Sequence, residues 1–432
     1  MGLEAKIRTK KARIAVVGLG YAGLPLAIEF SKAGFRVTGI DTNPQRCAQV
    51  NASKSYIEDI SDADLKQATG DGKLVATTEA KQLSSCDVAV ISVPTPLRKT
   101  KDPDISYIVE AVEAIREHLP TGSLVVLEST TYPGTCEEII QPVFEKQGLE
   151  MGKDMFLAFS PERVDPGNTR FKTRNIPKVV GGITPRCTAV AVELYKTIVR
   201  EVVPVSSTRV AEMVKLLENT FRTVNISLIN EFAMMCGKMG IDVWEVIDAA
   251  ATKPFGFMPF YPGPGLGGHC LPVDPLYLSW KARLMDIEAG FIDLSTRINS
   301  AMPQYVVSKV VDALNSEHKC VNGSRILILG VSYKRNVSDT RESPAAEIMH
   351  HLAEKGAEIS YCDPLVPEFC CGGEVLCSQP LNPQVLSEHD CAVIVTDHDA
   401  IDIGLVVSHS QIVVDTRNAT KNTKGKAKVV KI

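Results

Sequence analysis

The sequence predicts an α/β protein in which two doubly wound parallel sheets, each covered by helices on both faces, are joined by a helical middle section. In the first half of the chain, short β-branched runs alternate with segments of helical periodicity, which is the pattern of a parallel sheet. The same alternation restarts near the C-terminus after a long helical stretch. The 432 residues also exceed one ordinary core, so we expect two or three domains.

The first sheet is predicted from five short apolar runs. They lie at 13–17, 35–40, 87–93, 123–129 and 155–159. Between the runs are segments such as 105–119, whose apolar residues recur at intervals of three and four, as an amphipathic helix requires.

The middle of the chain predicts one long helix over 207–240, because this stretch has no proline and no internal glycine before Gly237. The helix is apolar over more than a narrow stripe, so it can connect two domains and supply a subunit interface, although a purely internal core helix fits equally well. A glycine- and proline-rich loop follows at 253–275, and then a helical block at 276–317.

The second sheet is predicted from strands at 325–330, 357–364, 390–397 and 411–418, with a helix at 343–356. The basic tail that follows is expected to be solvated.

Composition excludes several classes of protein. The 47 Lys+Arg and 51 Asp+Glu give a net charge of −4, without the basic excess that nucleic-acid or membrane surfaces require. No apolar run is long enough to span a membrane, and no signal peptide is recognisable. The twelve cysteines are scattered without a CxxC pair, which favours reduced thiols in the cytoplasm and no metal site.

The sequence GLGYAG at 18–23 directly follows the first predicted strand and opens a helix. In this context Gly18 permits a tight turn, Gly20 lets the backbone approach a pyrophosphate, and Gly23 allows close packing of helix on strand. Tyr21 and Ala22 then lie at the helix N-terminus, which faces the phosphates. The motif indicates a Rossmann-like dinucleotide site, against the alternative of a glycine-rich turn without a ligand.

Asp41 ends the second predicted strand, eighteen positions after Gly23. A carboxylate there can accept hydrogen bonds from the ribose hydroxyls and would repel a 2′-phosphate, so NAD is favoured over NADP. The nearby Arg46 argues weakly the other way. A dinucleotide site most often serves hydride transfer, but regulatory modules and epimerases also use it.

Cys270 lies in the glycine-rich loop, in PGPGLGGHCLPVDP. A thiol beside a nicotinamide can trap an aldehyde as a thiohemiacetal, which loses hydride to become a thioester that water hydrolyses. The competing interpretation is a structural cysteine. His269 invites a dyad, but neighbours in an extended loop usually point apart. Asp274 is a better polar partner, and it could equally cap the helix that follows.

Lys215 and Asn219 are four positions apart and share a face of the long helix. They could mark its wet edge, or Lys215 could stabilise an oxyanion while Asn219 orients substrate. Glu162, at the end of a predicted strand, is a further carboxylate candidate.

Seven segments together resemble the nucleotide-sugar 6-dehydrogenase family. They are GLGYAG, VPTP (93–96), ESTTYPGT (128–135), FSPERVDPG (159–167), KLLENTFRTVNISLINE (215–231), GPGLGGHCLPVDP (263–275) and GVSYKRNVSDTRESP (330–344). The resemblance implies oxidation of the C6 alcohol of a nucleotide-sugar to a carboxylate in two NAD-dependent steps. It also implies a homodimer built on the long helix.

The resemblance assigns roles to the residues that match the family's motifs. It makes Cys270 the nucleophile, has Lys215 and Asp274 position a water and assist deprotonation, and makes Glu162 the base for thioester hydrolysis. The remaining expected contacts are Thr130 with the water, Thr95 with the nicotinamide, and Arg163, Asn219, Gly267, Lys334 and Arg341 with the nucleotide-sugar.

The resemblance also divides the chain into a Rossmann NAD domain (1–206), a helical connector that carries the cysteine loop (207–318) and a Rossmann-like UDP-sugar domain (319–432). The last of these lacks the later glycines of a dinucleotide fingerprint, so UDP is expected there instead of a second NAD.

One departure bears on the substrate. Members that act on UDP-glucose typically read GGSC-F-P-K-D, whereas this chain has His269 and Val273 in GGHC-L-P-V-D. This variant is similar to the branch that uses UDP-N-acetylhexosamines, which implies UDP-N-acetylglucosamine ahead of its manno and galacto isomers. The alternatives are a two-electron hydroxyacid or UDP-glucose dehydrogenase, and a sensor that binds NAD or a nucleotide-sugar without catalysis.

Overall fold

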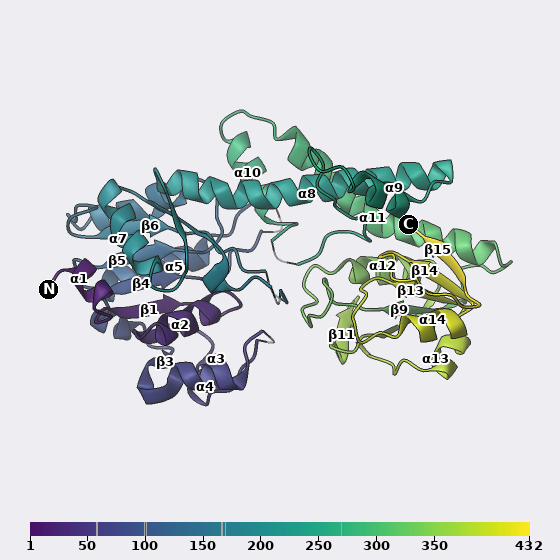
Figure 1. Cartoon of the computed structure of the whole chain (residues 1–432), viewed down its shortest axis with the longest axis horizontal. Coiled ribbons are helices and arrows are strands. Elements are labelled where there is room, and N and C mark those ends of the chain that lie inside the picture. The colour runs from purple at the N-terminus through teal and green to yellow at the C-terminus, as the bar shows by residue number, and fades with distance from the viewer. Residues whose placement is uncertain (58, 99, 101, 166, 169, 269) are drawn as a thin grey trace. The chain divides into compact units, whose positions relative to one another are not determined.

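The computed structural model describes all residues of the chain except 58, 99, 101, 166, 169 and 269 (Figure 1). The chain forms two compact units. The first comprises Met1–Glu218 and Leu276–Ile287, and the second comprises Asn219–Pro275 and Glu288–Ile432. Among the described residues, no helix combines the length and the apolarity that a membrane span needs.

The first unit contains an eight-stranded sheet of order β3-β2-β1-β4-β5-β6-β7-β8, parallel except for the β6–β7 pair. Its strands are β1 (Arg13–Val17), β2 (Arg36–Ile40), β3 (Leu74–Thr77), β4 (Val88–Ile91), β5 (Leu124–Leu127), β6 (Phe156–Phe159), β7 (Lys178–Gly182) and β8 (Val202–Val205). The five predicted strands are β1, β2, β4, β5 and β6; the other three were not predicted.

Helices cover both faces of this sheet, because successive side chains of each strand point to opposite sides. Ile14 and Val16 face one apolar core, whereas Ala15 faces the other. The helices are α1 (Leu3–Arg8), α2 (Gly23–Lys32), α3 (Pro44–Asn51), α4 (Asp62–Thr69), α5 (Ser106–His118), α6 (Gln141–Glu145) and α7 (Pro185–Tyr195). The doubly wound prediction is therefore confirmed for this half.

The second unit contains a parallel five-stranded sheet of order β10-β9-β13-β14-β15 and a small antiparallel hairpin. The sheet strands are β9 (Arg325–Leu329), β10 (Glu358–Cys362), β13 (Cys391–Ile394), β14 (Ile412–Asp415) and β15 (Lys428–Lys431), and the hairpin is β11 (Glu368–Cys371) with β12 (Glu374–Cys377). Its helices include α12 (Pro344–Glu354), α13 (Pro383–Glu388) and α14 (Ile403–His409).

The basic tail was wrongly expected to be solvated throughout. Its last residues form β15, which pairs in parallel with β14. Val430 packs against the core and Ile432 is buried. The short VV pair supplies enough apolar surface to add an edge strand once a sheet is present to receive it.

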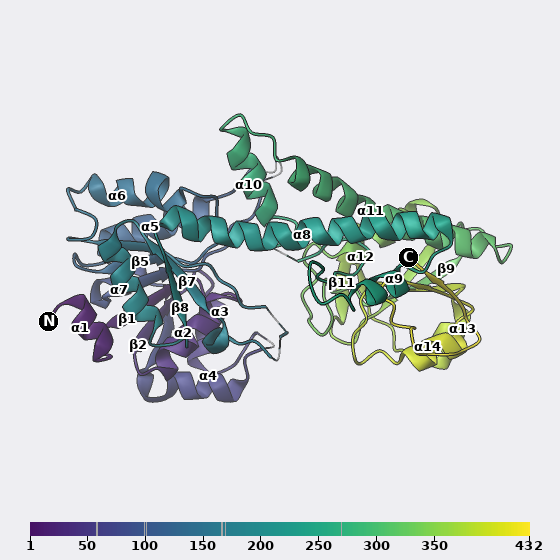
Figure 2. The ribbon, with the colours of Figure 1, turned by 45° about the horizontal axis from the view of Figure 1, so that its top comes forward.

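The helical middle consists of α8 (Thr208–Met239), α9 (Val243–Ala250), α10 (Asp274–Arg283) and α11 (Gly290–Asn315). Figure 2 shows α8 as one continuous helix, as predicted, although the division between the two compact units falls within it, after Glu218. The α/β prediction with two Rossmann-like sheets, a long central helix and a helical connector is thus confirmed.

Candidate active site

The turn between β1 and α2 has the geometry that a dinucleotide loop needs. Gly18 has a φ of +93°, and a Cβ added there would lie 2.3 Å from the carbonyl oxygen of Ser92. A Cβ at Gly23 would lie 1.9 Å from the carbonyl oxygen of Gly18, whereas one at Gly20 would meet no protein atom within 4 Å. Two glycines therefore close the turn, and the third leaves an open approach to the backbone.

Asp41 lies at the carboxyl end of β2 and is buried beside this turn. Its Oδ2 accepts a hydrogen bond from the Leu19 N–H at 2.8 Å, and its Oδ1 accepts one from the Asn43 N–H at 2.8 Å. The Arg46 guanidinium lies 3.7 Å from Oδ2 and stacks over Tyr56. Because the Arg46 guanidinium is paired with the Asp41 carboxylate, its charge is already balanced within the protein. Asp41 and Arg46 together therefore fit a ribose with unmodified hydroxyls.

The carboxyl ends of β4 and β5 are joined at the same edge of the sheet. The Ser129 hydroxyl donates to the Val93 carbonyl at 2.8 Å and accepts from the Val93 N–H at 2.9 Å. Thr130 is the next residue and is half-buried. The Tyr277 hydroxyl donates to the carbonyl of Thr95. Both threonines therefore lie where an α/β sheet binds its ligands.

Glu162 is held by hydrogen bonds and charges from several elements. Its Oε1 accepts from the N–H groups of Arg163 at 2.7 Å and Val164 at 2.6 Å. Its main-chain carbonyl accepts from the Lys215 ammonium at 2.6 Å. Its Oε2 lies 3.7 Å from the ammonium of Lys178. The Lys215 contact joins α8 to the main chain at Glu162.

Behind Glu162 lies a buried cluster that the sequence analysis missed. Lys178 begins β7 and Glu128 follows β5, and their charged atoms are 3.1 Å apart. The Tyr195 hydroxyl donates to the other oxygen of Glu128. The sequence does contain a signal for this cluster, because Glu128 and Lys178 are each a charged residue next to a short apolar run.

The pKa values of Glu128 and Glu162 are shifted in opposite directions. Burial raises the pKa of Glu128 to about 7, although the Lys178 charge opposes that shift. Burial alone would also raise the pKa of Glu162, but Lys178, the two amide hydrogen bonds and Lys215 together hold that pKa below its usual range. Glu162 is therefore ionised at neutral pH, whereas Glu128 keeps its proton to a higher pH than an ordinary carboxyl.

Replacing Glu128 with glutamine should make the stability of the protein less sensitive to pH. Between pH 5 and pH 8 the folded wild type loses a proton from Glu128 that the unfolded chain has already lost, so folding should weaken by at most roughly 3 kcal/mol. Glutamine keeps an acceptor for Tyr195 but does not titrate. Melting temperatures measured at both pH values should show that the variant becomes more stable relative to the wild type as pH rises. A difference in melting temperature that is the same at both pH values would contradict the raised pKa of Glu128.

Cys270 lies in the second compact unit with Asn219 and Asp274. Its side chain is exposed, and its main-chain carbonyl accepts from the Asp274 N–H at 2.8 Å. The buried Asp274 carboxylate accepts from the Asn219 amide at 2.5 Å. Asp274 is the first residue of α10, and its carboxylate contacts α8. Asn219 and Asp274 thus form a buried pair that is joined to Cys270 through the Asp274 N–H. His269 lies outside the described residues.

The glycines before Cys270 anchor its loop to the segment after β9. A Cβ at Gly267 would lie 2.7 Å from the Cβ of Tyr333 and 2.8 Å from the Glu342 carbonyl oxygen. Gly268 donates its N–H to the Arg341 carbonyl at 3.1 Å and has a φ of +80°. The missing side chain of Gly267 lets the thiol loop pack against the segment that carries Lys334 and Arg341, and the expected contact of Gly267 with substrate stays a prediction.

Two further predicted residues, Arg163 and Arg341, form ion pairs. The Arg163 guanidinium contacts Glu218 at 2.5 Å and the Pro177 carbonyl at 2.6 Å. Arg341 forms a two-pronged ion pair with Asp339. The predicted residues divide between the two compact units. The second unit contains Cys270, Asn219, Asp274, Lys334 and Arg341, and the first contains Thr95, Thr130, Glu162, Arg163 and Lys215. Their roles in binding and catalysis stay predictions.

Comparison with known proteins covers nearly the whole chain. Residues 12–199 match the NAD binding domain of the UDP-glucose/GDP-mannose dehydrogenase family, residues 209–301 match its central domain, and residues 327–422 match its UDP binding domain.

Among the described residues, no group of three or more His, Cys, Asp or Glu side chains is placed to hold a metal ion.

Two curated relatives and two solved structures illustrate the similarity. The UDP-N-acetyl-D-glucosamine 6-dehydrogenase of Pseudomonas aeruginosa is 40% identical over 83% of this chain and 84% of its own length. The UDP-N-acetyl-D-mannosamine dehydrogenase of Pyrococcus horikoshii is 35% identical over 95% of this chain and 96% of its own length. The solved structure of the Pyrococcus horikoshii UDP-D-ManNAc dehydrogenase has a TM-score of 0.89 at 34% identity and covers 97% of this chain and 99% of that one. The Staphylococcus aureus UDP-N-acetyl-mannosamine dehydrogenase Cap5O has a TM-score of 0.83 at 31% identity and covers 97% and 98%.

Proposed function

This chain belongs to the UDP-glucose/GDP-mannose dehydrogenase family, and we propose that it oxidises the C6 hydroxyl of a UDP-N-acetylhexosamine to a carboxylate in two NAD-dependent steps. One observation carries the proposal. The exposed thiol of Cys270 lies on a loop that is tied to the buried Asn219–Asp274 pair and to the segment of Lys334 and Arg341. A sensor that only binds ligands would need no nucleophile in that position.

The chain's own residues divide the chemistry. Gly18, Gly20 and Asp41 hold NAD, which when bound accepts the hydride that C6 loses in each oxidation. Asp274 and Lys215 orient a water and help to remove the C6 hydroxyl proton as the alcohol becomes an aldehyde. The positive charge of Lys215 also favours the oxyanions that develop at C6.

Cys270 keeps the aldehyde on the enzyme. Its sulfur adds to the C6 carbonyl carbon, the carbonyl oxygen gains a proton, and a thiohemiacetal forms. Loss of a hydride and the hydroxyl proton from this adduct leaves a thioester. Glu162 then takes a proton from an attacking water that Thr130 contacts, the carbon–sulfur bond breaks, and the thiol returns with the carboxylate as product.

We propose UDP-N-acetylglucosamine as the substrate. The loop sequence GGHCLPVD, with Val273 where UDP-glucose enzymes typically have lysine, supports an N-acetylated sugar. The relative from Pseudomonas aeruginosa supports the gluco configuration. The manno isomer is the second candidate, because several relatives with longer coverage are named for it.

A nucleotide-sugar panel with NADH counting tests the proposal. We expect two NADH for each UDP-N-acetylglucosamine consumed, and a kcat/KM at least about tenfold above that for UDP-glucose, because a site that binds the N-acetyl group loses those contacts when the group is absent. UDP-N-acetylmannosamine and UDP-N-acetylgalactosamine complete the panel. One NADH per sugar would indicate a two-electron dehydrogenase, a preference for UDP-glucose would contradict the loop argument, and ligand binding without turnover would indicate a sensor.

We further propose that the enzyme is a homodimer joined along α8. Large apolar side chains on this helix are 40% to 69% exposed and recur every three or four residues, with one gap of seven: Val210, Met213, Leu217, Phe221, Leu228, Phe232, Met235 and Met239. An apolar stripe of this length is unusual on a monomer's surface. A second copy of α8 would cover it with a self-complementary surface.

Replacing Leu228 and Phe232 together with glutamate should convert the dimer to a monomer, because two charges would be buried at the α8 interface. Light scattering after size-exclusion chromatography measures the molar mass directly. Val375→Glu is the control, since Val375 is also an exposed apolar residue but lies on β12, outside α8. An unchanged molar mass in the double variant would overturn the α8 interface.

Reduced thiols support a reducing compartment, for which we propose the cytoplasm. All twelve cysteines lie among the described residues, and none of them is in a disulfide. The proposed mechanism itself requires Cys270 as a thiol. The net charge of −4 gives no support to a nucleic-acid or membrane partner.

A further inference from the structure

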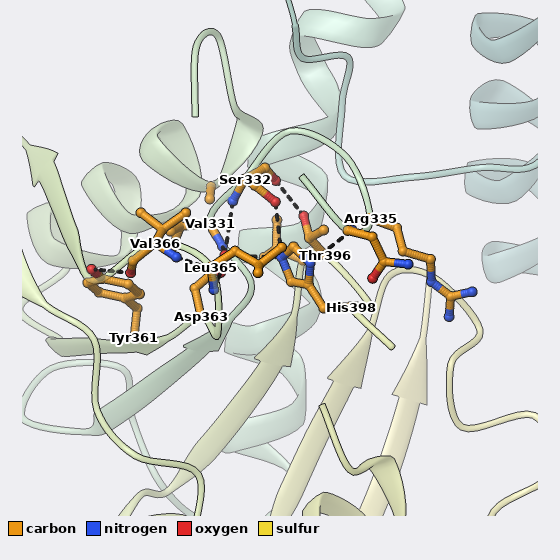
Figure 3. Close-up of polar contacts among 12 residues, drawn as sticks. Val331, Ser332, Arg335, Tyr361, Asp363, Leu365, Val366, Thr396 and His398 are labelled. Carbon is orange, nitrogen blue, oxygen red and sulfur yellow. Dashed lines mark hydrogen bonds and ion pairs between the residues drawn. The ribbon is translucent and has the colours of Figure 1, made fainter. Parts of the chain in front are cut away.

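The carboxyl edge of the second unit's sheet contains two loops that interlock. The loop 331–336 follows β9 and carries Lys334, and the loop 396–399 follows β13. The Thr396 hydroxyl donates to the Ser332 carbonyl at 2.6 Å, as Figure 3 shows.

Side chains at the tips of both loops extend this connection. The Arg335 guanidinium donates to the Asp397 carbonyl at 2.5 Å and contacts its carboxylate at 2.9 Å. The Asn336 amide donates to the Asp399 carboxylate at 2.5 Å, and the Asp399 N–H donates back to the Asn336 amide oxygen at 3.0 Å. The exposed parts of these pairs contribute little energy individually, so the buried contacts beneath them matter more.

His398 is the buried centre of the connection, with 2% of its surface exposed. The Asn336 N–H donates to its Nδ1 at 3.0 Å, so Nδ1 carries no hydrogen. The Ser332 hydroxyl donates to the Lys334 carbonyl at 2.9 Å, so its oxygen can only accept from the ring. The single hydrogen on Nε2 is therefore shared between two acceptors. Nε2 lies 3.0 Å from the Ser332 hydroxyl oxygen and 3.1 Å from the Asp363 carboxylate (Figure 3). This donor accounting identifies the neutral Nε2–H tautomer.

Asp363, which follows β10, also anchors the start of the loop 331–336. Its Oδ2 accepts from the N–H groups of Val331 at 2.7 Å and Ser332 at 3.3 Å, and its Oδ1 accepts from those of Leu365 at 2.8 Å and Val366 at 3.1 Å. Both oxygens are thus occupied within the protein before His398 is counted.

Asp363 occupies the position that Asp41 has in the NAD domain. Each follows the strand next to the first strand of its sheet, and each accepts a main-chain N–H from the turn after that first strand. Gly330 also repeats Gly18, because a Cβ there would lie 2.2 Å from the Thr396 carbonyl oxygen. The difference is His398, which covers the carboxylate that a dinucleotide's ribose would use. The carboxylate at this position of the second sheet therefore anchors loops within the protein.

We propose that His398 is a positioning residue for nucleotide-sugar binding: it accepts from Asn336 and donates to Ser332 and Asp363, and so fixes the backbone on both sides of Lys334. This inference rests on the proposed function only in taking the loop 331–336 as a UDP contact. The buried imidazole binds the Asp363 carboxylate in place of a ligand. The loop 331–336 therefore binds a nucleoside diphosphate through Lys334 and main-chain groups.

Calorimetric titration with UDP, together with separate KM values for NAD and for the sugar, tests the proposal. His398→Ala should weaken UDP binding and raise the sugar KM by about tenfold or more, because the loop must then be ordered by the ligand. The NAD KM and kcat should stay within about twofold of the wild type. His398→Asn, which keeps an acceptor near the Nδ1 position, should recover most of the UDP affinity.

The matched control is His389→Ala. His389 is also buried in this domain, where its ring contacts the Ser360 hydroxyl at 2.7 Å and the Val385 carbonyl at 2.6 Å, but it precedes β13 and lies away from the loop 331–336. Equal losses of UDP affinity in both alanine variants, or an unchanged affinity in His398→Ala, would overturn the positioning role. Failure of the wild type to bind UDP would instead overturn the proposed function on which this inference rests.

Discussion

Replacing Cys270 with serine should lower uronate formation by about a thousandfold or more, because a neutral hydroxyl cannot replace a thiolate as nucleophile towards the aldehyde. The exchange changes one atom on an exposed side chain, so folding and ligand binding should be unaffected. Product analysis by mass spectrometry, with NADH counted in parallel, measures the loss. UDP binding by calorimetry should match the wild type.

Cys320→Ser is the control for this experiment, since Cys320 is also exposed and lies outside the glycine-rich loop. It should leave uronate formation unchanged. If Cys270→Ser forms uronate at the wild-type rate, the covalent mechanism is wrong and Cys270 has a structural role. If the variant instead releases aldehyde with one NADH per sugar, the first oxidation is independent of the thiol.

Replacing Glu162 with glutamine should stop the reaction at the thioester. Glutamine keeps an oxygen to accept the N–H groups of Arg163 and Val164, but it cannot take a proton from water. We expect the steady-state rate to fall by about a hundredfold to a thousandfold after a burst of two NADH per active site. Mass spectrometry of the intact protein should then detect the sugar acyl group on Cys270.

The low pKa of Glu162 gives this prediction a pH dependence. Since Lys178 and the amide hydrogen bonds hold its pKa below the usual range despite burial, hydrolysis in the wild type should remain active down to mildly acidic pH. Glu201→Gln is the matched control, because Glu201 is an exposed carboxyl in the same unit. Accumulation of free aldehyde in Glu162→Gln, without an adduct on Cys270, would place Glu162 in an earlier step.

Much of the fold could be predicted because its signals are local. The run 13–17 is β1 in full, and the glycine at 23 is required by the carbonyl of Gly18, only five positions away. The strands β7 and β8 were missed because a lysine opens one and a proline lies within the other, which weakens the strand pattern. The edge strand β15 was missed because two valines flanked by lysines are too short an apolar run to indicate a strand without β14 beside them.

The sequence predicted most of the residue types of the candidate site, but it predicted only some of the contacts between them. Cys270 and Asp274 stand out within one loop, but the Asn219 amide that binds Asp274 lies 55 positions away. Lys178 and Glu128 were overlooked because each, taken alone, is one charge at the end of an apolar run. Only their 3.1 Å separation in a buried site shows that they act together.

The sequence by itself therefore determined the fold class, the NAD motif and the identity of the candidate nucleophile, because these depend on periodicity and on residues within one turn or loop. The tertiary structure alone decided which buried charges face Glu162, how the glycines of the thiol loop pack on the segment after β9, and that His398 covers Asp363. These are contacts between distant segments of the chain. Burial and hydrogen bonding select them only after the strands have brought their carboxyl ends to a common edge.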